Sequence, residues 1–361
     1  MVNQKPNVLF LTNLPAPYRF PIWNRMAVKT NLQVVFTLSE KNWRNWPPPS
    51  EVNWQFKFLR LRCFRLGEYE FIPKFYGARH LLKNTQVAIV SSWEVPIYIH
   101  VILKAWRRKI PLVILYYSHA YSQKYKNVLI TKIRSWIYSK ADLVITFGSY
   151  STASVKAMGI ADQKILSLFN PVDVNWYHTY STAQTKLENT GHRYLYVGQL
   201  IERKNVNSLI HAFSRIRKEF DTLTVVGDGE ELSTLKSLAE NRGISDFVSF
   251  LGHRNSFEIA QIYSQHNTLI LPSVNEVWGL VVNEALASGM HVVVSNKCGV
   301  TDLIKDMKGC FLCGTDEFSI ANAMQNSSSN WQGHIAIPEI LKFTPEKWAD
   351  LVLQRILAEF H

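Results

Sequence analysis

Short apolar runs alternate with amphipathic segments along the whole chain. Each run has the length of a buried strand, and the segments between them carry apolar residues at helical spacing. Alternating strands and helices predict mostly parallel, doubly wound sheets. In the first half, we predict strands at 7–12, 32–38, 87–91, 112–116 and 143–146, with helices at 20–28, 74–84, 96–108 and 125–138.

The pattern pauses at 169–173 and then starts again. In the second half, we predict strands at 194–197, 222–226, 248–251, 268–271 and 291–295, with helices at 205–219, 230–241, 256–265 and 281–288. The polar segment 326–337 predicts a surface connection, and the stretch 345–360 predicts an amphipathic helix.

A chain of 361 residues is too long for one ordinary core and long enough for two domains. We therefore predict two Rossmann-like domains, residues 1–172 and 173–344, with the C-terminal helix 345–361 packing back on the first domain. Ligands of doubly wound folds bind at the carboxyl ends of the strands. A cleft between two facing domains is the expected site.

Basic residues are concentrated in the first half. Residues 1–173 contain 24 Lys and Arg against 8 Asp and Glu, a net charge of +16, whereas the remainder has a net charge of −4. This asymmetry predicts an anionic partner for the first half. The segments 60–65, 99–109 and 124–140 mix cations with aromatic and aliphatic residues, which favours anionic lipid headgroups. Nucleic acid is not expected, because the sequence has no known nucleic-acid-binding signature.

No apolar run reaches the ~18 residues that cross a bilayer, and the first 20 residues lack the features of a signal peptide. We expect a cytoplasmic protein that binds peripherally to the inner face of the cytoplasmic membrane. In such a chain, Cys63, Cys298, Cys310 and Cys313 argue against a disulfide framework. Cys310 and Cys313 have metal-ligand spacing without a second pair, so we expect them to be small buried residues of a strand.

The segment that ends at Glu284 carries the main candidate chemistry. The predicted strand 268–271 is followed by a loop, and Gly279 then opens a helix whose free N–H groups suit a diphosphate. Glu276 in the loop could accept hydrogen bonds from sugar hydroxyls, and Glu284 from a ribose diol. Either carboxylate alone could equally be an ordinary solvated group.

Glu276 and Glu284 lie within Pro-Ser-x-x-Glu-x-x-Gly-Leu-x-x-x-Glu-Ala-x-Ala-x-Gly at 272–289. This pattern resembles the signature of the retaining glycosyltransferases of family 4, which have the GT-B fold of two Rossmann-like domains facing across a cleft. The resemblance covers most of the second half and is weaker over the first. It implies an acceptor-binding first domain and a second domain that binds a nucleotide-sugar donor. It also implies that Glu276 lies by the donor sugar, that Glu284 binds the ribose, and that the backbone between them cradles phosphate and sugar hydroxyls at Trp278, Gly279, Leu280 and Val281.

The run from Gly198 to Lys204 resembles the family's Gly-Arg-Leu-x-x-x-Lys-Gly turn, whose Arg and Lys neutralise the donor diphosphate. Lys204 matches, but Gln199 stands where Arg is usual and Asn205 where Gly is usual. Arg203 either supplies the missing charge or is a surface charge at the start of a helix.

Three further positions follow from the resemblance. Gly227 and Gly229 match the family's donor-domain loop, which favours a nucleotide contact over a plain turn. His119 follows the strand 112–116, where the family has a catalytically important His that touches the donor sugar; a structural role is the alternative. Arg19 follows the first strand and is a candidate for contact with acceptor or phosphate, at even odds with a surface charge.

The sequence contains no Asp-x-Asp pair, so a carboxylate-held metal is not expected, and no cofactor is expected. We therefore predict a retaining, metal-independent enzyme with Glu276, His119 and Lys204 as its catalytic residues. It would move a hexose from a nucleoside-diphosphate sugar to a saccharide or lipid-linked saccharide in cell-surface polysaccharide biosynthesis. Two alternatives remain: a nucleotide-sugar epimerase of the same fold, and a non-catalytic nucleotide-binding partner subunit, which Gln199 alone favours.

Overall fold

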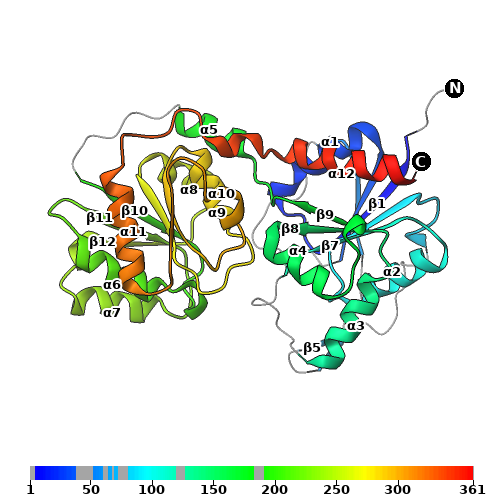
Figure 1. Ribbon diagram of the computed structural model, residues 1–361, viewed down its shortest axis with the longest axis horizontal. Coiled ribbons are helices and arrows are strands. Elements are labelled where there is room, and N and C mark those ends of the chain that lie inside the picture. The colour runs from blue at the N-terminus through cyan, green and yellow to red at the C-terminus, as the bar shows by residue number, and fades with distance from the viewer. Residues whose placement is uncertain are drawn as a thin grey trace. The chain divides into compact units, whose positions relative to one another are not determined.

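The computed structural model describes residues 5–37, 52–59, 64–66, 69–71, 80–118, 127–182 and 191–360. The chain divides into two compact units (Figure 1). The first consists of residues 1–168 with 345–361, and the second of residues 169–344. Each unit is built around its own parallel sheet.

Over the described residues, the sheet of the first unit has seven strands in the order β3-β2-β1-β6-β7-β8-β9, all parallel. Every residue of β6, β7 and β8 is buried, as a sheet covered on both faces requires. The strands are β1 Asn7–Thr12, β2 Asn31–Phe36, β3 Gln55–Phe58, β6 Val87–Val90, β7 Leu112–Tyr116, β8 Leu143–Phe147 and β9 Ile165–Leu168.

The helices of this unit are η1 Pro17–Arg19, α1 Phe20–Lys29, α2 Pro96–Arg107, α3 Val128–Tyr138, α4 Gly148–Ala157, η4 Asp162–Lys164 and α12 Pro345–Phe360, and a small antiparallel hairpin joins β4 Phe64–Leu66 to β5 Tyr69–Phe71. Helix α12 lies alongside α1 (Figure 1). Arg25 of α1 donates to both carboxylate oxygens of Asp350 of α12, at 3.0 and 2.8 Å. The C-terminal helix therefore completes the first unit, and its Trp348 is buried there.

Within the second unit, the described chain forms a six-stranded parallel sheet in the order β12-β11-β10-β13-β14-β15. Its strands are β10 Arg193–Val197, β11 Thr222–Val226, β12 Val248–Gly252, β13 Thr268–Leu271, β14 His291–Ser295 and β15 Cys310–Cys313. Its helices are α5 Val174–Thr182, η5 Glu202–Lys204, α6 Val206–Ile216, α7 Leu232–Asn241, η6 Ser245–Phe247, α8 Ser256–Ser264, α9 Leu280–Ala287, α10 Thr301–Ile304, α11 Glu317–Ser329 and η7 Glu339–Lys342.

Both sheets reverse their strand order beside the first strand of the unit. In the second unit the reversal lies between β10 and β13, and in the first between β1 and β6. The connections that leave the two central strands diverge at such a point, so the carboxyl edge there is where doubly wound sheets bind ligands. The strand order thus directs attention to the loops after β10 and β13.

The predicted fold class, with two parallel doubly wound sheets, is confirmed, but several elements differ from the prediction. Helix α11 extends to Ser329, so the predicted surface connection 326–337 is wrong over its first residues. The described part of the predicted helix 74–84, residues 80–84, is a turn rather than a helix, and its earlier residues lie outside the described ones. Helices α4 and α5 and strands β3 and β9 were not predicted. Helix α4 consists largely of small polar residues, so tertiary packing rather than an apolar stripe decides its conformation.

Candidate functional site

The loop after β13 is held in place by backbone hydrogen bonds to the segment after β14. Gly299 N donates to Glu276 O at 3.0 Å, Val300 N to Trp278 O at 3.2 Å, and Glu276 N to Lys297 O at 3.3 Å. A Cβ on Gly299 would lie 2.0 Å from Val277 O, so only glycine permits this approach. The segment 297–300 was not singled out in the sequence, yet it fixes the conformation of the Glu276 loop.

Lys204 and Glu276 form an ion pair that joins the loops after β10 and β13. The Lys204 ammonium donates to Glu276 Oε2, and the side chains are only 12% and 13% exposed. Arg203 lies 3.8 Å from the same carboxylate oxygen and donates to Asn275 O at 3.3 Å, with 45% of its side chain exposed. Two cations thus share one carboxylate. This excess positive charge at the sheet edge suits a polyanionic ligand.

Asn205 explains why the turn begins a helix without the family's usual glycine. Its backbone is left-handed at φ 59°, a conformation that Asn tolerates better than most residues. Its side-chain amide donates to Pro272 O at 3.1 Å and to Thr315 O at 2.8 Å. The residue therefore also ties the β10 loop to the β13 loop.

Gly279 lies at φ 96° and is the N-cap of α9. This backbone conformation favours glycine, and a Cβ would in addition lie 2.7 Å from Leu271 Cδ2. Leu280 and Val281 form the first turn of α9, where N–H groups have no carbonyl partner within the helix. The indole of Trp278 is buried, and its N–H donates to Asn283 Oδ1 at 3.3 Å. This hydrogen bond anchors the loop to α9.

Two tyrosines hold the Glu284 carboxylate. Tyr263 of α8 donates to Glu284 Oε2 at 2.8 Å, and Tyr177 of α5 also donates to this carboxylate. Burial raises the pKa of Glu284 above its ordinary value, and the two tyrosine hydrogen bonds oppose that rise. Neither tyrosine was predicted as a site residue, because both come from helices outside the motif.

Gly227 and Gly229 pack the loop after β11 against the loop after β10. A Cβ on Gly227 would lie 1.9 Å from Gly198 O, and one on Gly229 would lie 2.2 Å from Leu200 O. Leu200 N donates to Asp228 O at 2.9 Å across the same junction. This close packing accounts for both glycines, and their contact with a nucleotide stays a prediction. Gln199 is exposed at this edge, and its carbonyl accepts a hydrogen bond from Tyr196.

Arg19 lies at the carboxyl edge of the sheet in the first unit. It donates to Thr12 Oγ1 at 3.3 Å, and its guanidinium carbon is 5.0 Å from the centre of the Tyr117 ring and 5.7 Å from that of Tyr18. The Tyr117 ring in turn stacks on the Phe147 ring, with 4.4 Å between the two ring centres. The catalytic candidate His119 lies outside the described residues.

The remaining sequence candidates are cysteines: Cys298 and Cys313 are buried and Cys310 is partly buried. Cys310 and Cys313 lie on β15, as expected, and burial raises the pKa of each thiol to about 12. Cys63 lies outside the described residues. Within the part of the chain that the structure describes, His, Cys, Asp and Glu form no group of three or more that could hold a metal ion. None of the helices in the described residues has the length and apolarity needed to span a membrane.

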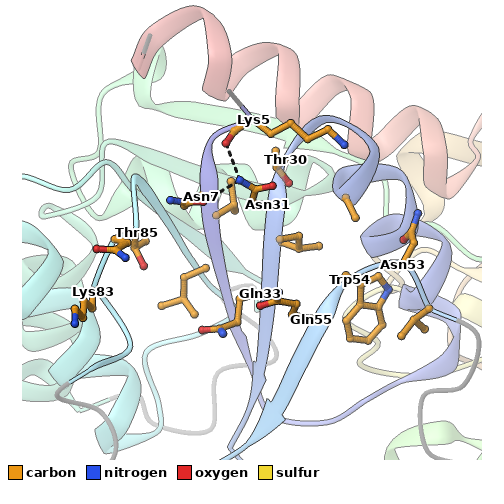
Figure 2. Close-up of a pocket in the computed structure, with 16 residues that line it drawn as sticks. Lys5, Asn7, Thr30, Asn31, Gln33, Asn53, Trp54, Gln55, Lys83 and Thr85 are labelled. Atoms are coloured by element: carbon orange, nitrogen blue, oxygen red, sulfur yellow. Dashed lines mark hydrogen bonds between the residues drawn. The ribbon is translucent and has the colours of Figure 1, made fainter. Parts of the chain in front are cut away.

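A cavity of about 780 Å³ lies in the first unit (Figure 2). It opens at the amino ends of β1, β2 and β3, where Asn31 donates to Lys5 O and to Asn7 Oδ1. This is the sheet edge opposite to Arg19, and none of the candidate site residues lines it. The cavity therefore plays no part in the site described above.

Known structures share this architecture over nearly the whole chain. HepE from Anabaena, solved in complex with UDP, covers 98% of the chain and 100% of its own length, with a TM-score of 0.76 and 16% identity. The chain has the GT-B fold with two Rossmann-like units. Residues 181–332 match the family described as glycosyl transferases group 1.

Curated relatives match part of the chain. An uncharacterized glycosyltransferase of Methanocaldococcus jannaschii is 32% identical over 139 residues, which are 38% of this chain and 36% of that protein. The alpha-monoglucosyldiacylglycerol synthase of Streptococcus pneumoniae is 35% identical over 133 residues, 36% of this chain and 30% of that enzyme. These matches therefore span about a third of each relative's length.

Proposed function

We propose that the protein is a retaining, metal-independent glycosyltransferase of family 4 that transfers a hexose from a nucleoside-diphosphate sugar. The observation that carries the proposal is the convergence of Lys204, Arg203 and Glu276 at the switch point of the second sheet. The start of α9 follows the same loop. Cations and helix N–H groups at one sheet edge are the chemistry that binds a diphosphate.

The donor occupies the carboxyl edge of the second sheet in this proposal. Lys204 and Arg203 neutralise the diphosphate, together with the N–H groups of Leu280 and Val281. Glu284 accepts hydrogen bonds from the ribose diol and is kept in position by its two tyrosines. The UDP complex of HepE supports a nucleotide ligand for this fold. Gly198, Gln199, Gly227 and Gly229 line the nucleotide side.

The reaction proceeds on one face of the donor sugar. The bond between the anomeric carbon and the β-phosphate oxygen breaks, and its electron pair stays on the phosphate. The acceptor oxygen bonds to the same face of that carbon, and its proton passes to the departing phosphate oxygen. Lys204 stabilises the growing negative charge. Glu276 exchanges part of its pairing with Lys204 for hydrogen bonds to the sugar, and His119 contacts the sugar from the first domain.

The acceptor is a saccharide or a lipid-linked saccharide, and Arg19 is the acceptor-side candidate in the first unit. The Streptococcus relative is named for a glycolipid product, which supports a lipid-linked acceptor. We place the enzyme in cell-surface polysaccharide biosynthesis. It would be cytoplasmic and bound peripherally to the inner face of the membrane.

A donor screen tests the proposal. Nucleoside diphosphate sugars of each base are incubated with glycan acceptors, and nucleotide release is measured for the wild type, Lys204→Ala and Arg215→Ala. Arg215 forms an ion pair of 2.7 Å with Glu317 elsewhere in the same unit, so it is the matched control. We expect acceptor-dependent release that Lys204→Ala abolishes and Arg215→Ala preserves. Nucleotide binding without release would indicate a partner subunit, and a new sugar without acceptor would indicate an epimerase.

A further inference from the structure

An apolar face is exposed on the first unit, at α3 and the end of α2. Among the described residues, Val128, Leu129, Ile133 and Trp136 of α3 are 70%, 66%, 43% and 49% exposed, and Trp106 of α2 is 46% exposed. We name these five residues the α2–α3 face. Leaving large apolar side chains in water is unfavourable, so a cluster of them marks an interaction surface.

The five residues belong to one surface. Leu129, Ile133 and Trp136 are four and three positions apart, which places them on one side of the helix. On the opposite side of α3, Arg134 and Tyr138 are buried. Lys140 connects the two helices, because its ammonium lies 4.4 Å from the Trp106 ring centre and 5.1 Å from that of Trp136.

The charge around this face has one sign. The segments 96–109 and 127–140 together contain seven Lys and Arg and no Asp or Glu. Arg107, Arg108, Lys109 and Lys132 are exposed beside the apolar residues. A second copy of the same face would therefore meet like charge, which disfavours self-association.

We infer that the α2–α3 face docks on an anionic lipid surface. The aliphatic side chains enter the boundary between headgroups and acyl chains, the two indoles lie at that boundary, and the cations bind the headgroups. A nucleic acid would meet the cations but would not remove the aliphatic side chains from water. The inference rests on the proposed function in one respect: a lipid-linked acceptor would be reached at the membrane. Binding to lipid can be measured without any transfer of sugar.

Vesicle sedimentation of the full chain tests the apolar part of this face. The vesicles contain phosphatidylcholine alone or with about one third phosphatidylglycerol, at moderate salt. We expect binding to the anionic vesicles only, weakened about tenfold or more by Leu129→Gln with Ile133→Gln. The matched control is Phe220→Gln with Ile337→Gln, two exposed apolar residues of the second unit, which should bind like the wild type.

A second pair of variants tests the charge. Arg107→Gln with Lys132→Gln should weaken binding about 30-fold, and raised salt should weaken the wild type in the same direction. The inference is overturned if the wild type does not bind anionic vesicles, if it binds neutral ones equally, or if Leu129→Gln with Ile133→Gln binds unchanged. It is also overturned if the face proves to be a dimer contact that this variant separates. Nucleotide release with a soluble acceptor, measured in parallel, reports on the proposed transferase activity independently of vesicle binding.

Discussion

The carboxyl edges of the two sheets are built differently. In the second unit, the loops after β10, β11 and β13 are tied together by an ion pair, an asparagine amide and close glycine contacts. In the first unit, the described edge presents Arg19 among Thr12, Tyr18 and Tyr117. The second edge is thus a fixed, charge-pairing site, and the first is a cation among aromatic rings. A diphosphate needs fixed cations, whereas a sugar acceptor is suited to aromatic rings and single polar contacts.

The largest effect should come from the Lys204–Glu276 pair. In the proposed reaction, Lys204 stabilises the leaving diphosphate. Its removal also takes the nearer of two cations from the nearly buried Glu276 carboxylate, so Lys204→Ala should lower kcat about 10²–10³-fold. Glu276→Ala and the double variant complete a double-mutant cycle, measured as nucleotide release. Because both residues act on one donor, the double variant should lose much less than the product of the single effects. Fully multiplicative losses would show that the pair does not act as a unit.

The glycine contacts should matter for stability and nucleotide binding together. Gly227→Ala forces a Cβ to within 1.9 Å of Gly198 O, so it should destabilise the second unit by about 3 kcal/mol and weaken nucleotide binding. Gly243→Ala is the control: Gly243 is left-handed at φ 65° but has open space around it, so the cost should be about 1 kcal/mol. Thermal unfolding and nucleotide titration measure both effects. If the two variants were equally destabilised, close packing would not explain why position 227 is a glycine.

The tyrosine contacts should tune the ribose site. Tyr263→Phe removes a hydrogen bond to the Glu284 carboxylate, which should weaken nucleotide binding about tenfold. That bond lowers the pKa of Glu284, so its loss raises the pKa further. Nucleotide affinity falls as the carboxylate becomes protonated on acidification, and in the variant this fall should begin at a higher pH.

Calorimetric titration across pH measures this shift. Tyr194→Phe is the control, because the Tyr194 hydroxyl lies in the same unit and donates to Met324 O rather than to Glu284. An unchanged pH profile in Tyr263→Phe would mean that the tyrosine supports only the packing of α8.

The smallest effect should come from the first unit. Arg19→Ala leaves the donor site intact, so it should raise the acceptor KM about fivefold with little change in nucleotide affinity. Arg25→Ala is the control, because it breaks the ion pair with Asp350 away from this sheet edge. Steady-state kinetics with varied acceptor measures the difference. A loss of nucleotide affinity in Arg19→Ala would contradict the assignment of the donor to the second sheet alone.

The fold was predictable where a strand is continuously apolar. The predicted strands 112–116, 268–271 and 291–295 agree with β7, β13 and β14 at both ends, because fully buried parallel strands leave a clear apolar run. The edge strand β3 has four residues, none of them fully buried, and α5 and α11 carry weak apolar stripes. Those elements depend on the surfaces against which they pack.

By itself, the sequence determined two parallel α/β units, the resemblance of 272–289 to a sugar-transfer signature, and the positions of Lys204, Glu276 and Glu284. These follow from local patterns and spacing. Only the tertiary structure decided that Lys204 pairs with Glu276, 72 positions away, and that Tyr177 and Tyr263 hold Glu284. It also decided that Gly227 faces the carbonyl of Gly198. Such contacts join loops and helices that are far apart in the sequence. They form only when the strands take their order in the sheet, so no local spacing encodes them.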